Sequence, residues 1–302
     1  MKNDSIIPPI LRKGDKVAVI SPSGMAEPEA VQRGIAVIEG WGLRVATGAS
    51  ALASDGQFAG TDALRLADIQ LALDDPEVKA VFCSRGGYGL SRIIDRIDFS
   101  SFAASPKWIV GFSDVTVLHT WIASLFGIAT IHGEMPVNYG NPQKTDRTLT
   151  TVRELLFGGS LTYEWEGAVT NPARAQGILT GGNLSLLYSL AGTVARPDTE
   201  GNILFIEDTG EQYYSVDRML TSLKLAGMLS NLAGLLVGDF SNMQDGRIPY
   251  GKSVTEIVND IAGGFGYPVW YGFPTGHCND NMALALGCRV SIVAAGSGTV
   301  MS

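Results

Sequence analysis

A short apolar run that turns into a helical stretch at a serine constrains the fold of this chain most. Trp108–Val110 has the composition of a buried strand, and residues 117–122 then place apolar side chains at helical spacing. The turn contains Gly111 and Ser113, and such a turn exposes the serine hydroxyl and leaves the N–H of Asp114 at a helix N-terminus. Ser113 is therefore either a nucleophile or a helix N-cap, and the local pattern alone favours the cap because Ser and Asp are both preferred there.

Apolar runs alternate with helical stretches along the whole chain. A strand at Lys16–Ile20, a helical stretch and a second strand at 43–46 form the opening β-α-β unit of a doubly wound α/β fold. With 302 residues, of which 45% are hydrophobic, the chain is long enough for two domains. Residues 158–175 lack a clear period, so we expect a first domain at residues 1–160 and a second at 161–302.

A second informative turn follows the predicted strand at Val78–Cys83. It has the sequence Ser84-Arg85-Gly86-Gly87-Tyr88-Gly89 and leads into a predicted helix at Leu90–Arg96. Consecutive glycines allow a ligand to approach the backbone closely, although an ordinary βα turn has the same composition. Because ligands of open α/β sheets lie at the carboxyl ends of the strands, we expect this turn and Ser113 to face one site.

A serine nucleophile requires a base, and the chain has only three histidines. His119 follows Ser113 by six residues, about 240° around a helix axis, which indicates a packing role. His132 ends a predicted strand and is expected to line the cleft or to support it from behind. His277 lies in a loop rich in Gly, Asn and Asp, where a catalytic histidine is presented, although a solvated histidine fits that loop equally well.

The group that orients the base is expected among the carboxylates. Glu207 and Asp208 follow the predicted strand at 202–206, and alternation along a strand directs only one of the two toward the cleft. The chain order Ser, Glu, His is that of the α/β-hydrolases. Their elbow has glycine two residues after the serine, where this chain has Val115, so this elbow is of another kind.

Several motifs occur in a fixed order along the chain. They are ISPSG, FAGTDALRLADIQLALDDPEVKAVFCSRGGYG, GFSDVTVLH, IHGEM, GGNLSLL, FIEDTGE and GFPTGHCNDNMALALG. Together they resemble the LD-carboxypeptidase family of serine peptidases, which has a murein-recycling branch and a microcin-immunity branch, and the SRGGYG turn is closer to the first. The resemblance implies an N-terminal flavodoxin-like doubly wound domain and a smaller C-terminal α/β domain of the swivelling type.

The resemblance also implies the catalytic residues and the reaction. Ser113 would be the nucleophile, His277 the general base and Glu207, rather than Asp208, the residue that orients His277. The site would lie between the domains and would cleave the amide between an L-centre, diaminopimelate or Lys, and the terminal D-Ala of murein tetrapeptides in cell-wall recycling. The resemblance implies a homodimer, and we expect no cofactor.

Backbone and side-chain groups near the elbow are the candidates for binding the substrate. We expect the N–H groups of Gly87 and Asp114 to hold the oxyanion that forms during the reaction. Arg85 is the nearest cation for the free carboxylate of the substrate, because its guanidinium matches that group, although a salt bridge fits Arg85 equally well. Tyr88 and Asn183 are further candidates for substrate binding.

Composition limits the partners and the compartment. The net charge of −8, without a block of Lys or Arg, excludes nucleic acid and an anionic membrane surface as partners. The first residues contain no apolar stretch typical of a signal peptide, and no run of about 18 apolar residues occurs. Three cysteines without paired spacing are typical of the reducing cytoplasm and indicate neither disulfides nor a zinc site. We therefore expect a cytoplasmic enzyme without a metal.

Three other functions stay open. Within the family, the alternative is hydrolysis of a peptidyl or aminoacyl nucleotide, the microcin-immunity activity. From another class, the chain could be a non-catalytic protein that binds a small ligand between two α/β domains. A metal hydrolase that uses His277 and Asp280 is the third alternative.

Overall fold

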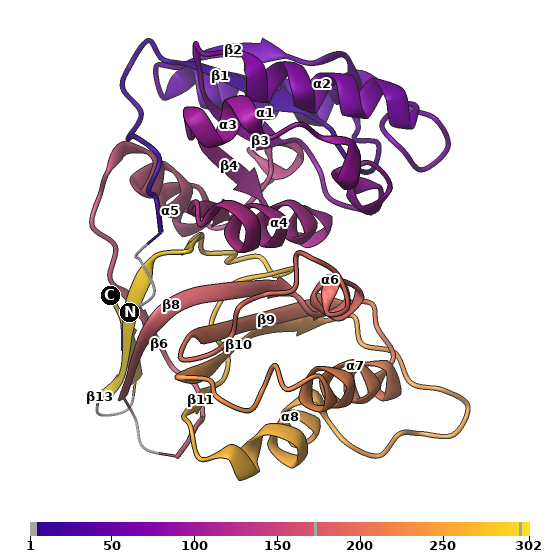
Figure 1. Ribbon diagram of the computed structural model, residues 1–302, viewed down its shortest axis with the longest axis vertical. Coiled ribbons are helices and arrows are strands. Elements are labelled where there is room, and N and C mark those ends of the chain that lie inside the picture. The colour runs from indigo at the N-terminus through magenta and orange to yellow at the C-terminus, as the bar shows by residue number, and fades with distance from the viewer. Residues whose placement is uncertain (1–4, 172–173, 296–297) are drawn as a thin grey trace.

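The computed structural model describes residues 5–171, 174–295 and 298–302, which form two sheets stacked one above the other in Figure 1. The strands of the first sheet are β1 (Lys16–Ile20), β2 (Arg44–Thr47), β3 (Val78–Cys83), β4 (Trp108–Gly111), β5 (Thr130–His132) and β12 (Leu284–Leu286). Their order is β12-β5-β4-β3-β1-β2, and all neighbours are parallel except β12 and β5. The doubly wound arrangement predicted from the sequence is confirmed.

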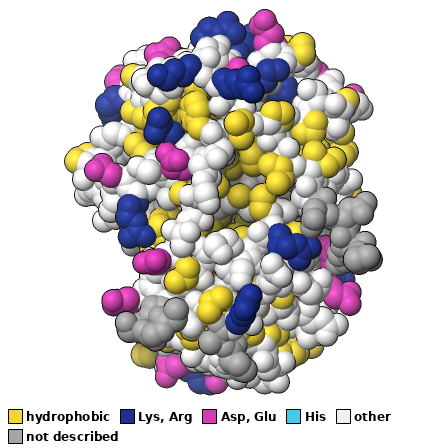
Figure 2. Space-filling view, turned by 90° about the vertical axis from the view of Figure 1, so that its left-hand side faces the viewer, with side chains coloured by type: hydrophobic (Ala, Val, Ile, Leu, Met, Phe, Trp, Pro, Cys, Tyr) yellow, Lys and Arg dark blue, Asp and Glu magenta, His cyan; other side chains and the backbone are white. Residues whose placement is uncertain are grey.

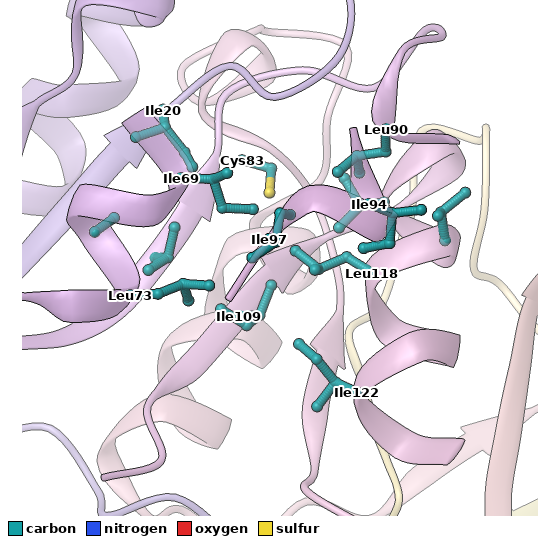
Figure 3. Packing of buried hydrophobic residues seen from close by; sticks show 14 of the residues in the cluster. Ile20, Ile69, Leu73, Cys83, Leu90, Ile94, Ile97, Ile109, Leu118 and Ile122 are labelled. Atoms are coloured by element: carbon teal, nitrogen blue, oxygen red, sulfur yellow. The ribbon is translucent and has the colours of Figure 1, made fainter. Parts of the chain in front are cut away.

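Helices cover both faces of the first sheet. They are α1 (Pro28–Gly40), α2 (Asp62–Asp74), α3 (Ser100–Ala104), α4 (Thr116–Phe126) and α5 (Asp146–Phe157). Side chains alternate along each strand, so Ile109 packs with α2, α3 and α4, whereas its neighbours Trp108 and Val110 pack with α1 and α5. Figure 3 shows the first of these two cores, with Ile69 and Leu73 of α2 and Leu118 and Ile122 of α4 around the strands. Burial of these side chains fixes the position of β4, which leads to Ser113.

The second sheet carries the other half of the chain. Its strands are β6 (Tyr163–Trp165), β7 (Val169–Thr170), β8 (Arg174–Asn183), β9 (Ile203–Thr209), β10 (Gly234–Ser241), β11 (Val269–Trp270), β13 (Arg289–Ala295) and β14 (Gly298–Met301). Their order is β6-β14-β13-β8-β9-β10-β11-β7, with β8, β9, β10 and β11 parallel. One face packs against α6 (Leu184–Leu190), α7 (Tyr213–Leu225) and α8 (Val254–Ala262).

The two halves meet at α4 and at β12. Figure 1 shows α4 between the sheets, where it packs against β8 and α6. Strand β12 comes from the far end of the chain but pairs with β5 of the first sheet. The first sheet is therefore completed by residues from beyond the predicted boundary near residue 160, and that boundary stays a prediction.

Two sequence predictions about local structure were wrong. Residues Leu90–Arg96 do not form one α-helix but two short 3-10 turns, η2 (Leu90–Arg92) and η3 (Ile94–Arg96). The predicted strand at 202–206 continues through both carboxylates, because β9 ends only at Thr209. None of the helices in the described part of the chain has the length and apolar character needed to span a membrane.

Candidate active site

The turn after β4 holds Ser113 in a conformation that few residues adopt. Phe112 is extended, and Ser113 begins the short 3-10 turn η4 (Ser113–Val115) with φ 62°, in the left-handed region. Such a backbone is strained for a residue with a side chain, and strain of this kind is concentrated at functional sites. In the described structure Ser113 caps no helix, since Val115 is the N-cap residue of α4. The helix-cap interpretation is therefore wrong, and the role of Ser113 as a nucleophile stays a prediction.

The turn after β3 lies against this elbow. Gly24 N donates to Gly86 O at 2.9 Å, and the Asp114 carboxylate accepts a hydrogen bond from Leu90 N at 2.9 Å. Asp114 is almost completely buried, which raises the pKa of its carboxyl, while the hydrogen bonds that it accepts act in the opposite direction. The Asp114 side chain thus connects the end of the turn at residues 84–89, which we call the glycine turn, to the 3-10 turn η4 that precedes α4. The role of the Asp114 N–H as an oxyanion donor stays a prediction.

Glu207, in β9, and His277, in the loop between β11 and β12, form a hydrogen-bonded pair. His277 Nδ1 lies 2.7 Å from Glu207 Oε2, although 70 residues separate the two. The Glu207 side chain is fully buried, whereas 22% of the His277 side chain is exposed. Gly276 permits this approach: its φ is +114°, and a Cβ atom there would lie 2.8 Å from Glu207 Oε2. The loop of His277 therefore packs directly on the carboxylate.

The surroundings of His277 raise the pKa of its imidazole above the usual 6.5. Burial by itself lowers this pKa, but the hydrogen bond and the negative charge of Glu207 outweigh burial, with further contributions from Asp208 and Glu134. The Phe112 ring contacts the imidazole at a centroid distance of 4.9 Å. A proton on Nδ1 is held toward the carboxylate, so Nε2 carries the lone pair that a general base needs.

Asp208 is the one of the two carboxylates that lines the cleft, in agreement with the expectation that only one of them faces it. Glu207 lies outside the described lining and is connected to the cleft through His277. Asp208 accepts hydrogen bonds from Asn183 Nδ2 and Ser185 N, each at 2.9 Å. Burial, and then the charge of Glu207, raise the pKa of Asp208 to about 7. Of the two carboxylates, Glu207 is the one that bonds to His277, and Asp208 instead joins β9 to the start of α6.

Ser113 and His277 line the same cleft, which has a volume of about 640 Å³. The cleft lies at the carboxyl ends of β4 and β9, the position at which α/β sheets bind ligands. Ser113 follows a strand of the first sheet and His277 follows a strand of the second, so both halves of the chain contribute to the cleft. The other residues around the cleft are Arg85, Gly86, Gly87, Phe112, Met135, Val137, Asn138, Asn183, Ser185, Leu186, Asp208, Thr209 and Glu211.

The predicted substrate-binding residues divide into two groups. Arg85 and Asn183 line the cleft, and the Arg85 guanidinium also donates to Met25 O. Tyr88 lies outside the described lining, because its ring packs against Phe58 at a centroid distance of 6.0 Å. A role for each of these residues in binding substrate stays a prediction.

The two other histidines lie behind the elbow. His119 is buried and its Nε2 bonds to Gly111 O at 2.8 Å, in agreement with the predicted packing role. His132 is fully buried against the edge of Phe205 and lies outside the described lining of the cleft, so it supports the cleft from behind. Burial lowers the pKa of His119 to about 4 and the pKa of His132 well below its usual value, so both stay neutral.

Asp280 does not join His277 in a metal site. Its carboxylate accepts a hydrogen bond from Thr145 at 2.6 Å and lies 3.3 Å from the Arg147 guanidinium. Within the described ranges, no three His, Cys, Asp or Glu side chains are placed together to hold a metal ion.

The polar side chains Asn138, Ser185 and Glu211 are among the cleft residues that were not predicted from the sequence. Each follows a parallel strand, since Asn138 ends the 3-10 turn η5 (Pro136–Asn138) after β5, Ser185 lies in the first turn of α6 after β8, and Glu211 follows β9. The rule that ligands lie at the carboxyl ends of strands could have found all three.

Known proteins resemble this chain in sequence and in fold. Family models for the LD-carboxypeptidase N-terminal and C-terminal domains match residues 17–133 and 176–292. The chain is 38% identical to a probable murein peptide carboxypeptidase of Bacillus subtilis, over 94% of this chain and 91% of that protein. A crystal structure of muramoyltetrapeptide carboxypeptidase from Oxalobacter formigenes has a TM-score of 0.86 and 30% identity, covering 95% of this chain and 97% of that one. The microcin C7 self-immunity protein MccF in complex with aspartyl sulfamoyl adenosine has a TM-score of 0.88 but 21% identity, over 99% and 98% of the chains, and shows a shared fold.

Proposed function

The chain belongs to the LD-carboxypeptidase family of serine peptidases, and on that premise we propose that it removes the terminal D-Ala of murein tetrapeptides in cell-wall recycling. The observation that carries the proposal is the pair of His277 Nδ1 and Glu207 Oε2, 2.7 Å apart, at the edge of the cleft that Ser113 lines. The Ser-His-Glu arrangement is recognised by these geometric roles rather than by spacing in the chain.

In the first step, Ser113 Oγ attacks the carbonyl carbon of the amide between the L-centre and the D-Ala. His277 Nε2 takes the hydroxyl proton and then gives it to the nitrogen of the leaving D-Ala as the C–N bond breaks. Water attacks the resulting ester, its proton passes to His277, and Ser113 leaves with that proton. Buried Glu207 holds the imidazole in one tautomer and stabilises its charged form, in line with the raised pKa of His277.

The oxyanion of each tetrahedral intermediate would lie between the turn after β3, which contains Gly87, and the turn after β4, which contains Asp114. Gly87 lines the cleft with φ +97°, and Asp114 follows the nucleophile directly. Backbone N–H groups of both residues are the proposed donors, and loss of one such donor typically costs about 10²–10³ in kcat.

The charges of the cleft fit a peptide better than a nucleotide. Arg85 offers a guanidinium for the terminal carboxylate of the substrate. Glu211 lines the same cleft together with Asp208, whose raised pKa leaves it only partly ionised near neutral pH. The Glu211 carboxylate favours the ammonium group of Lys or diaminopimelate and repels a phosphate or sulfamate linkage. This argues for the murein-recycling activity over hydrolysis of a peptidyl or aminoacyl nucleotide.

Assembly and compartment are part of the proposal. The family models match on either side of residue 160, which supports domains at 1–160 and 161–302.

Apolar side chains gather on the upper half of the face in Figure 2, and basic side chains are scattered among acidic ones there. We propose a homodimer formed through apolar surface, and a cytoplasmic location where imported wall fragments are trimmed; light scattering of the purified protein tests the dimer.

Incubation of the purified protein with an L-Lys or diaminopimelate tetrapeptide tests the function directly. We expect release of D-Ala, and no release by Ser113→Ala. Absence of D-Ala release, or undiminished release by Ser113→Ala, would overturn the proposal. Hydrolysis of an aminoacyl sulfamoyl adenylate in preference to the tetrapeptide would support the microcin-immunity activity. Failure of a serine-directed covalent probe to label Ser113 would support a binding protein.

A further inference from the structure

The loop that carries His277 is bound by residues from the first half of the chain. We refer to residues 275–282 as the His277 loop. Lys144 Nζ donates to Cys278 O at 2.8 Å, and the Thr145 amide donates to the loop at 3.2 Å. Because both donors follow β5 and η5, the backbone that carries the base is attached to the sheet that carries the nucleophile.

Glu134 lies at the centre of these contacts. Its side chain is fully buried, and its Oε2 lies 2.6 Å from Lys144 Nζ. Its Oε1 accepts hydrogen bonds from Met135 N at 3.1 Å and from Asn138 Nδ2 at 2.8 Å. A buried ion pair adds little stability over well-packed apolar side chains, since both charges lose their hydration. Stability alone therefore does not account for this pair.

Asn281 connects Glu134 to the backbone next to His277. Asn281 is fully buried, its Nδ2 donates to Glu134 Oε2 at 3.3 Å, and its Oδ1 accepts from Gly276 N at 2.9 Å. Gly276 is the residue that packs on Glu207. The peptide between Thr275 and Gly276, one residue before His277, is thus located by a continuous series of hydrogen bonds that begins at Glu134.

We propose that Glu134 and Lys144 are positioning residues that hold the His277 loop so that the imidazole faces Ser113. The proposal rests on the proposed function, because it takes His277 to be the general base. Lys144 fixes the backbone after His277, and Glu134, through Asn281, fixes the backbone before it. We call these contacts of Glu134, Asn281 and Lys144 with the His277 loop the clamp. A displacement of about 1 Å of a catalytic group costs on the order of 10²-fold in rate, so loss of the clamp should lower kcat directly.

A double variant separates positioning from stability. Glu134→Gln or Lys144→Met alone leaves one buried charge without its partner, so each is expected to lower Tm. Glu134→Gln combined with Lys144→Met removes both charges, and its Tm is expected to return toward that of the wild type. We expect the double variant to have a kcat lower by roughly 10- to 100-fold, with KM changed by less than about twofold. A double variant with both Tm and kcat of the wild type would overturn the proposal.

A spectroscopic signal tests the same point without a substrate. The proton between His277 Nδ1 and Glu207 should give a downfield resonance in the proton spectrum, assigned by its loss in Glu207→Gln. In the double variant of Glu134 and Lys144 we expect this resonance to broaden or vanish, and an unchanged resonance would contradict positioning. If the wild type releases no D-Ala, the proposed function fails, while this comparison still decides whether the clamp holds His277.

The ion pair of Lys16 and Asp75 provides a matched control. Lys16 Nζ lies 2.8 Å from Asp75 Oδ2, and both residues are remote from the lining of the cleft. Lys16→Met combined with Asp75→Asn removes the same number of charges and should leave kcat and the resonance unchanged. A similar loss of kcat in this control would overturn the assignment of a special role to Glu134 and Lys144.

Discussion

A Cβ atom on Gly86 would lie 2.8 Å from Ser113 Cβ and 3.0 Å from Ser113 Oγ. The backbone of the turn at residues 84–89 and the side chain of Ser113, the proposed nucleophile, are therefore in direct contact. The contact follows from the sheet: β3 and β4 are parallel neighbours with Phe82 opposite Val110, so the turns after them meet. Glycine is required at position 86 because a side chain would have no room there. Its backbone conformation does not require glycine, since Gly87 has a positive φ and Gly86 does not.

Gly86→Ala should reduce catalysis without unfolding the protein. The added methyl group would force Ser113 or the glycine turn to shift, and we expect kcat/KM for the tetrapeptide to fall on the order of 10²-fold. Circular dichroism should show a fold close to that of the wild type. Gly192→Ala is the control, because a Cβ atom there meets no described atom within 4 Å, and it should retain full activity. Wild-type kcat/KM in Gly86→Ala would contradict the contact.

The left-handed conformation of Ser113 predicts a difference between two inactive variants. Ser113→Ala and Ser113→Gly both lose the nucleophilic hydroxyl, but only glycine adopts φ 62° without a steric cost. We expect Ser113→Gly to be more stable than Ser113→Ala by about 1 kcal/mol in the free energy of unfolding. Urea denaturation of both variants measures this difference, and equal stabilities would show that the elbow is unstrained.

Local sequence patterns were sufficient for strands β1 to β5 and for the position of the elbow, whereas β6, β7, β8 and β14 of the second sheet were not predicted. The apolar run before Gly111 and the helical spacing after Ser113 both depend on nearest neighbours, and the structure has β4 and α4 there. The helix predicted at Leu90–Arg96 does not form for a local reason. Gly89, the residue before it, has φ 150°, and only the 3-10 turns η2 and η3 follow. The contact between Gly86 and Ser113 was beyond the sequence, since it depends on which strands are neighbours.

The carboxylates show where strand-end reasoning fails. Glu207 and Asp208 were placed after the end of a strand, but pairing with β8 and β10 extends β9 to Thr209. Both side chains then lie inside the sheet, and one bonds to His277 while the other binds the start of α6. The partner of Glu207 comes from a loop 70 residues away, and those of Asp208 include the end of β8 and the first turn of α6, so only tertiary packing decides which partner each carboxylate receives.

Glu207→Gln should lower activity and move its pH dependence. His277 acts as a base when neutral, so kcat/KM rises with pH through its pKa, which Glu207 holds above 6.5 in the wild type. Without that charge, burial lowers the pKa, and the acid limb of the pH profile should move to lower pH. The maximum of kcat/KM should fall on the order of 10⁴-fold, as expected when the group that orients the base is lost.

The pH profile of Glu211→Gln is the matched control. Glu211 also carries a charge in the cleft, but the imidazole of His277 bonds to Glu207. Its removal should change KM for the tetrapeptide and leave the acid limb of the profile in place. An acid limb that moves equally in both variants would show that the general field of the cleft, rather than the hydrogen bond to Glu207, sets the pKa of His277.

The thiol of Cys278, next to His277, should be inert. Burial, and then the charge of Asp239, raise the pKa of Cys278 to about 12, so the thiolate that reacts with alkylating agents is almost absent at pH 8. We expect iodoacetamide to leave D-Ala release unchanged, whereas a serine-directed fluorophosphonate abolishes it. Cys278→Ser should be fully active, because Lys144 bonds to the backbone carbonyl of Cys278 and not to its side chain. Loss of wild-type activity in iodoacetamide, with protection in Cys278→Ser, would instead show that this thiol reacts and blocks the cleft beside His277.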